Sequence, residues 1–300
     1  MKRLIIMLLA LLALLLAACA EPDFPAEYKP DSAIDGGKLR IVASFYPLAE
    51  FSRQVGGGKV TVATVVSAGI EPHDFEPTPH DIAGINDAAV FIFNGGTLDP
   101  WAKKIVSELP SKTRSLDMSD MLGLDGADPH FWLDPVFAQK QVEITRDALA
   151  AADPVNAESY SQNAAAYLEK LVALDKEFSA TLASCATREI FTSHSAFSYL
   201  AARYGLTQVS IAGLSPDAEP SARGLADLAT EAKAKNIKYI FFETLTSTRL
   251  ADTLSTEIGA KTLVLNPLEG LTRDEVNSGT DYIAVQRQNL ANLKTALVCK

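Results

Sequence analysis

The stretch NAESYSQNAAAYLEKLVALDKEFSATLAS, which runs from Asn156 to Ser184, divides the chain into two halves and contains neither glycine nor proline. Its apolar residues recur at the three- and four-residue spacing of one helix face. They are Tyr160, Ala164, Tyr167, Leu168, Leu171, Leu174 and Phe178. At 3.6 residues per turn, the stretch predicts one amphipathic helix of about eight turns. A coiled-coil arm is the alternative, but a single unrepeated helix between two halves is better explained as a connection between them.

Before this helix, strand patterns and helix patterns alternate. Three short β-rich runs occur, and a helical pattern follows each of them. The runs are KLRIVASF (38–45), VTVATVVS (60–67) and AAVFIFNGG (88–96). Such alternation predicts a parallel sheet covered by helices.

After the helix, the alternation starts again. Strand patterns occur in EIFTSH (189–194), TQVSIAG (207–213), IKYIFFETL (237–245) and KTLVLNPL (261–268). We therefore expect an α/β fold of two α/β lobes, each with a mainly parallel four-stranded sheet, bridged by one long helix. Ligands gather at the C-terminal ends of such strands, so we expect a site in the cleft between the lobes. The expected boundaries are 39–154 for the N-terminal lobe, 155–185 for the linking helix and 186–300 for the C-terminal lobe.

The first residues carry an export signal. Two basic residues precede the apolar run Leu4–Leu16, and small residues then lead to Cys19. A single transmembrane anchor is the alternative, but the run is shorter than the roughly 20 residues that a span needs. Because Leu-Ala-Ala-Cys resembles the bacterial lipobox, we expect a lipoprotein signal peptide at 1–18 and a lipid on Cys19. The Pro-, Asp- and Gly-rich residues 19–38 are expected to form a flexible tether.

The charge balance is acidic. The formal net charge is −10, and removing Lys2 and Arg3 with the signal leaves 25 basic and 37 acidic residues, or −12. An acidic surface argues against nucleic acid as a partner and is compatible with cationic ligands.

Two cysteines, Cys185 and Cys299, follow the one expected to carry lipid. Export to an oxidising space permits a disulfide between them, and two isolated cysteines are a poor zinc set. Two free buried thiols are the alternative.

Three of the four histidines lie where strands or loops lead into helices. His73 follows a strand in SAGIEPHDFEPTP, His130 lies in DPHFWLDP ahead of a helix, and His194 ends EIFTSH. Each alone is equally well explained as a hydrogen-bonded ring, but together they favour zinc, which needs imidazoles directed from several elements. His80, at a helix start, is expected to be exposed or capping.

The segment DPHFWLDP has its own local prediction. Its two Asp-Pro pairs predict an extended backbone on either side of His130, because proline biases its predecessor away from the helix. Phe131 and Trp132 are expected to pack in the hydrophobic core beside His130.

Other chemistries lack their motifs. No G-x-x-x-x-G-K-[ST] phosphate loop and no G-x-S-x-G nucleophile elbow occurs. No basic stripe interleaves with the aromatic residues, which argues against a stacking platform for single strands.

Several long motifs follow one another in an order that resembles a known family. They are PHDFEPTP (72–79), DPHFWLDP (128–135), TSHSAFSYLAARYGL (192–206), GLSPDAEPSA (213–222), and FFET (241–244) followed by LNPLEGLT (265–272). Together with the lipobox, they resemble the metal-specific solute-binding lipoproteins of bacterial ABC importers for zinc and manganese, over nearly the whole chain. The resemblance implies two bridged lobes that enclose one metal ion, and no enzymatic activity.

The resemblance also implies a ligand set. The first lobe would supply His73 and His130, and the second His194 and a carboxylate from the loop after its last strand. In many relatives that loop reads L-D-P-L-G and its Asp binds metal, whereas this chain has Asn266 there. An amide does not neutralise a dication, so Glu269 becomes the candidate fourth ligand, with Asn266 or water as alternatives.

Metal identity and function follow from the same resemblance. Three imidazoles and one carboxylate suit zinc, and manganese-transporting relatives tend to carry Glu in place of His194. Glu243 is expected to orient a ligand. The resemblance implies an exported monomer that captures one Zn²⁺ ion and delivers it to an ABC permease and its ATPase. Its lipid on Cys19 would hold it at the outer face of the cytoplasmic membrane, or at the periplasmic side in a two-membrane bacterium.

Three alternatives stay open. The first is a manganese-binding protein, or one for another divalent metal, of the same importer class. The second is a zinc-dependent hydrolase, in which Glu243 or Glu76 would act as a base beside an activated water. The third is an adhesin role, with which some members of the family are credited.

Overall fold

The computed structural model describes residues 34–218 and 220–300. The predicted signal peptide, Cys19 and most of the predicted tether therefore lie outside the described residues. Within the part of the chain that is described, no helix combines the length and the apolar character needed to cross a membrane.

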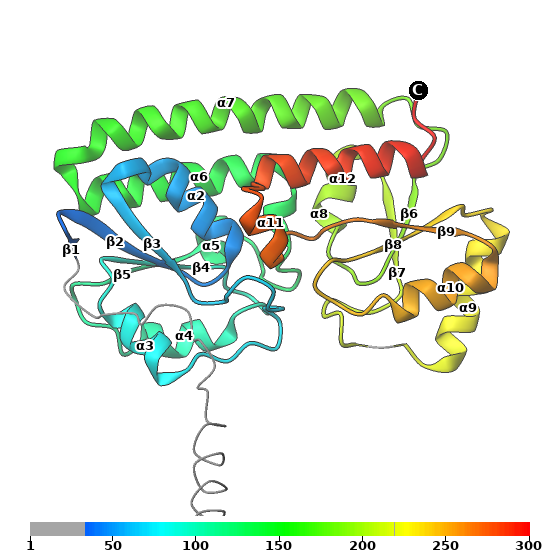
Figure 1. Cartoon of the computed structure of the whole chain (residues 1–300), viewed down its shortest axis with the longest axis horizontal. Coiled ribbons are helices and arrows are strands. Elements are labelled where there is room, and N and C mark those ends of the chain that lie inside the picture. Colours follow the sequence, from blue (N-terminus) through cyan, green and yellow to red (C-terminus); the bar gives the residue numbers. More distant parts are fainter. Residues whose placement is uncertain (1–33, 219) are drawn as a thin grey trace, which may run out of the picture. The chain divides into compact units, whose positions relative to one another are not determined.

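Four parallel strands form most of the first sheet (Figure 1). They are β2 (Lys38–Ala43), β3 (Val60–Thr64), β4 (Val90–Phe93) and β5 (Arg114–Asp117), in the order β3-β2-β4-β5. A two-residue strand, β1 (Ile34–Asp35), pairs antiparallel with the start of β2, so this sheet has five strands and not four. All four residues of β4 are buried, as expected for a central strand of a parallel sheet covered on both faces.

The second sheet repeats the same strand order. Its strands β6 (Glu189–Thr192), β7 (Thr207–Ser210), β8 (Tyr239–Phe242) and β9 (Lys261–Val264) are all parallel, in the order β7-β6-β8-β9. In both sheets the parallel strand that comes second in the chain (β3 or β7) lies at one edge, beside the first (β2 or β6). The third and fourth parallel strands follow on the other side of the first. The predicted fold class, α/β with two mainly parallel sheets and one long helix, is confirmed.

Helices cover the sheets and connect them. In chain order they are α2 (Tyr46–Gly56), α3 (Pro79–Asn86), α4 (Pro100–Val106), α5 (Met118–Met121), α6 (Pro135–Ala152), α7 (Ala157–Leu182), α8 (Ser198–Tyr204), α9 (Ala222–Ala234), α10 (Arg249–Ile258), α11 (Arg273–Asn277) and α12 (Tyr282–Ala296). Short 3-10 helices lie at η1 (Gly57–Lys59), η2 (Phe131–Leu133) and η3 (Pro154–Asn156).

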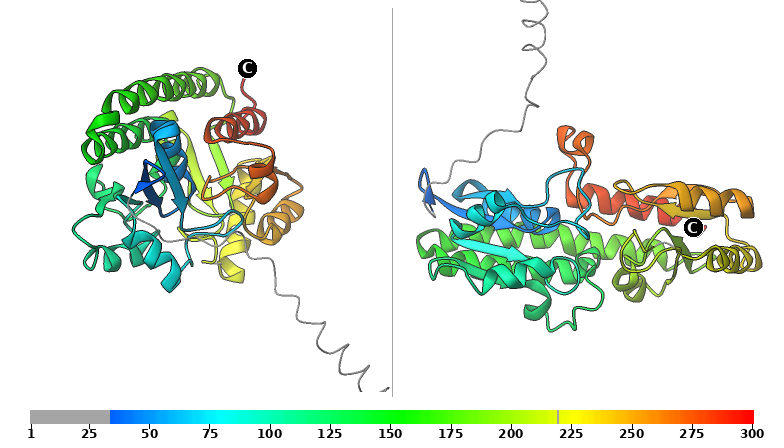
Figure 2. Two further views of the ribbon diagram at one scale, coloured as in Figure 1. Left: turned by 60° about the vertical axis from the view of Figure 1, so that its left-hand side comes forward. Right: turned by 90° about the horizontal axis from the view of Figure 1, so that it is seen from below.

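The long helix predicted from the apolar spacing is α7, with 26 residues. Its buried face contains the predicted apolar residues, except that Leu168 is half-buried. It lies beside α6 and α2 and continues along α12 (Figures 1 and 2). One helix therefore contacts elements from both halves of the chain, as a connecting helix must.

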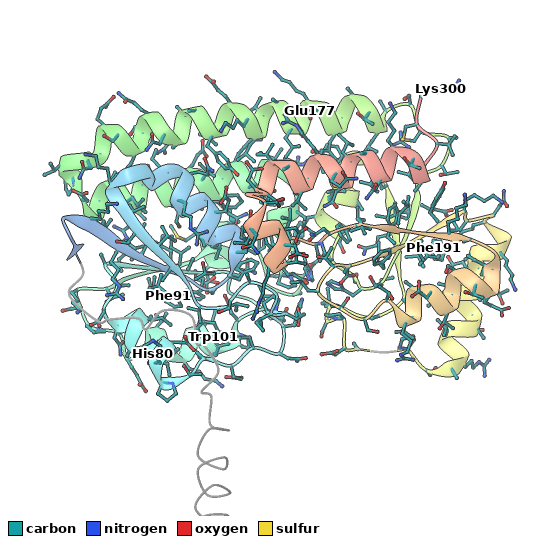
Figure 3. All side chains as sticks on the ribbon, in the orientation of Figure 1. His80, Phe91, Trp101, Glu177, Phe191 and Lys300 are labelled. Atoms are coloured by element: carbon teal, nitrogen blue, oxygen red, sulfur yellow. A yellow bond between two sulfur atoms is a disulfide. The ribbon has the colours of Figure 1, made fainter. Side chains whose placement is uncertain are left out.

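One hydrophobic core extends through both halves. Residues of the first sheet such as Ile41, of α7 such as Leu171, and of α12 such as Leu293 belong to the same buried cluster. Each sheet has a second, separate cluster on its other face, which includes Phe91 and Trp101 in the first half and Phe191 in the second (Figure 3). The described residues belong to a single compact unit, with no division between the two halves. The lobe boundaries given from the sequence therefore stay a prediction.

A disulfide joins Cys185 and Cys299. It ties the segment that follows α7 to the segment that follows α12, and the backbone of Ala186 also donates to Leu297 O at 3.0 Å. The disulfide thus links the C-terminal ends of α7 and α12, which lie at the upper right of Figure 1.

Candidate metal centre

Four side chains named from the sequence converge at one point. They are His73, His130, His194 and Glu269, and one donor atom from each lies within 4.8 Å of all the others. The Nε2 atom of His130 lies 3.2 Å from that of His73 and 3.3 Å from that of His194. Glu269 Oε1 lies 3.3, 3.2 and 3.2 Å from the Nε2 atoms of His73, His130 and His194.

These spacings have the size that a zinc site requires. A tetrahedron with ligands at 2.0–2.1 Å from its centre has edges of about 3.3–3.4 Å. The five distances above, 3.2–3.3 Å, are five of the six edges of such a figure. The second carboxylate oxygen, Oε2, is buried and has no hydrogen-bond partner among the described residues. The arrangement therefore fits one small dication held by four protein ligands.

His73 lies in the loop between β3 and α3. The carboxylate of Glu71 accepts from the backbone N–H of His73 at 3.0 and 3.2 Å, which fixes the turn that carries the ring. The backbone of Gly69, in the same loop, donates to Leu271 O in the second half at 2.9 Å. His73 is the most exposed of the four, with 6% of its side-chain area accessible against 0–1% for the others.

His130 is oriented by its own segment. Asp128 Oδ1 accepts from the backbone N–H of His130 at 3.0 Å and lies 2.8 Å from the ring Nδ1. A carboxylate on Nδ1 holds the proton there and leaves Nε2 free to bind a metal. The prediction of an extended backbone on both sides of His130 is wrong for residues 131–133, which form the 3-10 helix η2. Asp134, before Pro135, is extended at ψ 116° and caps α6 by accepting from Val136 N.

The aromatic neighbours of His130 are buried, as predicted. Phe131 and Trp132 are fully enclosed, and the Trp132 ring meets Phe45 edge-on with centroids 4.7 Å apart. They exclude water from the inner side of the cluster.

His194 is held by groups of the second sheet. Its Nδ1 lies 2.7 Å from Glu243 Oε1, at the end of β8, and the same oxygen accepts from the Ser193 hydroxyl at 2.5 Å. The carbonyl of His194 accepts from Thr192 Oγ1 at 2.7 Å and Gln208 Nε2 at 2.9 Å. Glu243 thus touches His194 and not the centre of the cluster.

Glu269 is brought into the cluster by a strained turn. Asn266 Oδ1 accepts from Leu268 N at 2.8 Å, and Leu268 has a left-handed backbone with φ 56°. For a residue with a branched side chain this conformation costs about 1–2 kcal/mol. The turn orients Glu269 inwards, whereas the amide oxygen of Asn266 is engaged within the turn. Of the two residues considered for the fourth position, Glu269 and Asn266, the structure brings Glu269 to the histidines.

The charges of the cluster influence one another. Burial alone would raise the pKa of Glu269, but His194 and the other two imidazoles outweigh it and hold that pKa well below its usual value. Burial alone would lower the pKa of His194, but Glu243 and Glu269 outweigh it and raise the pKa to about 10. The two carboxylates thus make the centre a favourable place for positive charge.

An acidic cavity of about 570 Å³ borders the His73 loop. Glu71, Asp74, Glu76 and Asp217 line it. Burial and the charge of Glu269 raise the pKa of Glu71 to about 8. Asp74, Glu76 and Asp217 in this lining make the side of the His73 loop attractive to cations.

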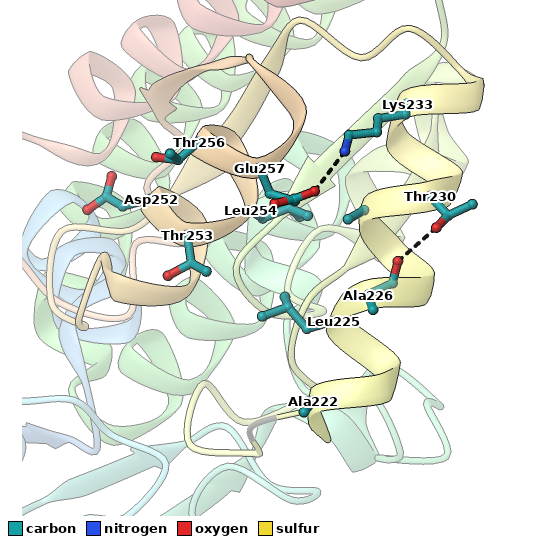
Figure 4. A pocket seen from close by; sticks show the side chains of 11 residues that line it. Ala222, Leu225, Ala226, Thr230, Lys233, Asp252, Thr253, Leu254, Thr256 and Glu257 are labelled. Atoms are coloured by element: carbon teal, nitrogen blue, oxygen red, sulfur yellow. Dashed lines mark hydrogen bonds and ion pairs between the residues drawn. The ribbon is translucent and has the colours of Figure 1, made fainter.

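Two other features lie apart from the cluster. His80 is exposed on α3, as predicted, and Figure 3 places it on the lower left. A cavity of about 830 Å³ lies between α9 and α10, with the ion pair of Lys233 and Glu257 at 2.7 Å across it (Figure 4). Neither a histidine nor a cysteine lines this cavity, so it lacks the imidazole and thiolate ligands that dominate zinc sites.

Sequence comparison relates the chain to zinc-uptake proteins. It matches the sequence model of the family described as zinc-uptake complex component A, periplasmic, over residues 41–296. It is 41% identical over 307 aligned positions to the high-affinity zinc uptake system protein ZnuA of Bacillus subtilis strain 168, covering 96% of this chain and 95% of that protein. It is 42% identical to the zinc-binding lipoprotein AdcA of Streptococcus pneumoniae strain TIGR4, covering 98% of this chain and 61% of that protein.

Comparison with solved structures also relates the chain to metal-binding proteins. The Zn(II)-bound ZnuA-like domain of Streptococcus pneumoniae AdcA superposes with a TM-score of 0.79 at 46% identity, covering 87% of this chain and 99% of that domain. The laminin binding protein Lmb of Streptococcus agalactiae, described as bifunctional with adhesin and metal transporting activity, superposes with a TM-score of 0.78 at 32% identity. That match covers 86% of this chain and 99% of the other.

Proposed function

This chain belongs to the family of zinc-uptake complex component A, periplasmic, and on that premise we propose that it is the zinc-binding component of an ABC metal importer. It captures Zn²⁺ outside the cytoplasm and delivers it to a membrane permease that an ATPase drives. The observation that carries the proposal is the cluster of three imidazoles and Glu269 at tetrahedral spacing.

The donor set favours binding over catalysis. His73, His130, His194 and Glu269 fill the four positions of a tetrahedral site, whereas catalytic zinc keeps a position for water. Glu243, which a zinc hydrolase would use as a base, is engaged by His194 and Ser193. Manganese prefers more oxygen ligands than this set provides, so zinc is the cargo.

The ion enters and leaves on the side of His73. This histidine is the most exposed ligand, and its loop borders the acidic cavity. The other three ligands are nearly or fully enclosed. A displacement of the His73 loop opens the site, and Phe75 of the same loop, which packs against the shared core, limits how far the loop can move.

The membrane attachment is a further part of the proposal. The chain acts as a monomer held by a lipid on Cys19 at the outer face of the cytoplasmic membrane, or at the periplasmic side of a two-membrane cell. The apolar run that ends in Leu-Ala-Ala-Cys supports it, as does the description of a 42% identical relative as a lipoprotein. Incorporation of labelled palmitate in cells tests it: the wild type takes up the label, and Cys19→Ala does not.

Calorimetry on the full chain in detergent, stripped of metal, tests the function. We expect one zinc ion to bind per chain, manganese to bind far more weakly, and no ester or peptide hydrolysis to accompany binding. A wild-type chain that binds no zinc contradicts the proposal.

The fourth ligand has a direct test. We expect Glu269→Gln to weaken zinc by more than the roughly 10- to 100-fold that loss of an outer partner costs. If Asn266→Ala reduced the zinc affinity more than Glu269→Gln, Asn266 and not Glu269 would be the fourth ligand.

A further inference from the structure

Helix α12 carries two buried side chains that bind the segment of His130. Tyr282 OH donates to Trp132 O at 2.6 Å, and Gln286 Nε2 donates to Leu133 O and to Tyr282 OH, both at 3.0 Å. Both side chains are fully buried. The carbonyls that they bind are those of the second and third residues after His130, so the position of the 3-10 helix η2 depends on α12.

One turn further along, α12 binds the segment of Glu269. Asn289 Oδ1 accepts from Asn266 N at 2.8 Å, and Asn289 Nδ2 donates to Asn266 O at 2.7 Å. Asn289 is 1% exposed, so water does not compete for these bonds. Because Asn266 closes the strained turn at Leu268, Asn289 fixes the base of the turn that orients Glu269.

The two ligand segments are also bonded to each other. Trp132 Nε1 donates to Pro267 O at 2.8 Å in a buried contact. Residues that are 139 positions apart in the chain, His130 and Glu269, thereby share one hydrogen-bonded frame. His194 is held differently, by Glu243, Thr192 and Gln208 of the second sheet.

We infer that α12 is a positioning element that holds His130 and Glu269 as a pre-assembled pair, through Tyr282, Gln286 and Asn289. The inference rests on the proposed zinc-binding function and deepens it. With Glu269 Oε1 fixed 3.2 Å from His130 Nε2, one edge of the tetrahedron exists before the ion arrives. A fixed edge of this length strengthens zinc binding, since the ligands lose little freedom, and it disfavours cations that need octahedral geometry.

Asn289→Ala tests the inference, and Asn292→Ala is its matched control. Asn292 lies one turn further along α12 and donates to Val264 O at 2.7 Å, in the same segment but before the ligand turn. For the full chain in detergent, we expect Asn289→Ala to weaken zinc about 10- to 100-fold in competition with a chelator. We expect it also to narrow the preference for zinc over manganese. Asn292→Ala should bind zinc as the wild type does.

Cobalt substitution separates positioning from simple destabilisation. The visible bands of bound Co²⁺ report the geometry of its ligands. We expect Asn289→Ala to change the band pattern and Asn292→Ala to preserve it, even where both variants lower the melting temperature of the metal-free protein. If Asn289→Ala keeps the wild-type spectrum and zinc affinity, α12 is only structural and the inference is wrong.

A second variant covers the case in which Asn289→Ala does not fold. Tyr282→Phe keeps the ring and removes only the hydroxyl that holds Trp132 O. It should weaken zinc and change the cobalt spectrum, and wild-type values for both would overturn the inference. A wild-type chain that binds no zinc contradicts the proposed function. If the wild type binds zinc and the variants bind it equally well, only the role of α12 is contradicted.

Discussion

At the scale of single residues, His194 gives zinc binding a dependence on pH. Glu243 and Glu269 overcome the effect of burial and raise the pKa of His194 to about 10, so the metal-free protein holds a proton there at neutral pH. Zinc needs the neutral imidazole, so binding releases this proton. Zinc affinity should therefore rise with pH from neutrality and level off above about 10.

Calorimetry at pH 7 in two buffers of different ionisation enthalpy measures the released proton. The apparent binding enthalpies should differ by about the difference in buffer enthalpies, for one proton per zinc. Glu243→Gln removes a charge that raises the pKa of His194, so fewer protons should be released by this variant. Identical enthalpies in both buffers for the wild type would contradict the protonated His194.

The histidines provide a second comparison at this scale. His130→Ala removes a buried side chain that we propose as a ligand, and it should weaken zinc binding strongly. His80→Ala changes an exposed residue of α3 and should leave the affinity intact. Titration against a chelating dye measures both. Equal losses from the two substitutions would show that His80 takes part in binding.

Which residues could be named from the sequence depends on what orients them. His73 follows a strand of the first sheet and His194 a strand of the second, and ligands gather at the C-terminal ends of such strands, so a shared site between the two halves could be predicted. Glu269 could be named only as a substitute for a missing Asp. Its direction depends on the left-handed backbone at Leu268, a residue type that rarely adopts it, and no sequence pattern signals that turn.

At the scale of elements, the disulfide between Cys185 and Cys299 makes a prediction about stability. It closes a loop of 114 residues between the ends of α7 and α12. Replacing both cysteines by serine should lower the free energy of unfolding by about 2–4 kcal/mol, because the unfolded chain regains its freedom. Denaturant unfolding measures the loss.

The double-serine chain also supplies the control. Reductant should destabilise the wild type and leave the serine variant unchanged. Zinc affinity should persist in both, since the disulfide lies at the far end of α12 from Tyr282. An equal response of the two chains to reductant would mean that the cysteines are not bridged in solution.

Strands with a run of apolar residues could be predicted from the sequence, whereas a strand without such a run could not. The four runs of the second half became β6 to β9, and long α7 followed its apolar spacing. The strand β5 reads RSLD, with only Leu116 fully buried, so it lacks the apolar run that marks a central strand. The hydrogen bonds from α12 to the segments of His130 and Glu269 join residues that are far apart in the chain. Local sequence patterns do not predict such contacts.

At the scale of the whole molecule, the shared core and the site between the halves couple zinc binding to the stability of the whole fold. Residues of both halves belong to one buried cluster, so thermal unfolding should occur in a single transition. Zinc at 100 times its dissociation constant should add about 2.7 kcal/mol of stability. In a chain of this size, each kcal/mol raises the melting temperature by about 2–4 °C.

Calorimetric scans with zinc and with a chelator test this expectation. The zinc-dependent shift should vanish in His130→Ala, while the single transition remains. Two resolved transitions in the metal-free wild type would show that the halves unfold separately in spite of the common core.

The spacing of the ligands along the chain also bears on how the protein is made. His73 and His130 are 57 residues apart, His130 and His194 are 64 apart, and Glu269 lies a further 75 residues on (269 − 194). A nascent chain with only its first half folded contains two of the four proposed ligands. We therefore expect tight zinc binding only after the segment of Glu269 has joined the fold.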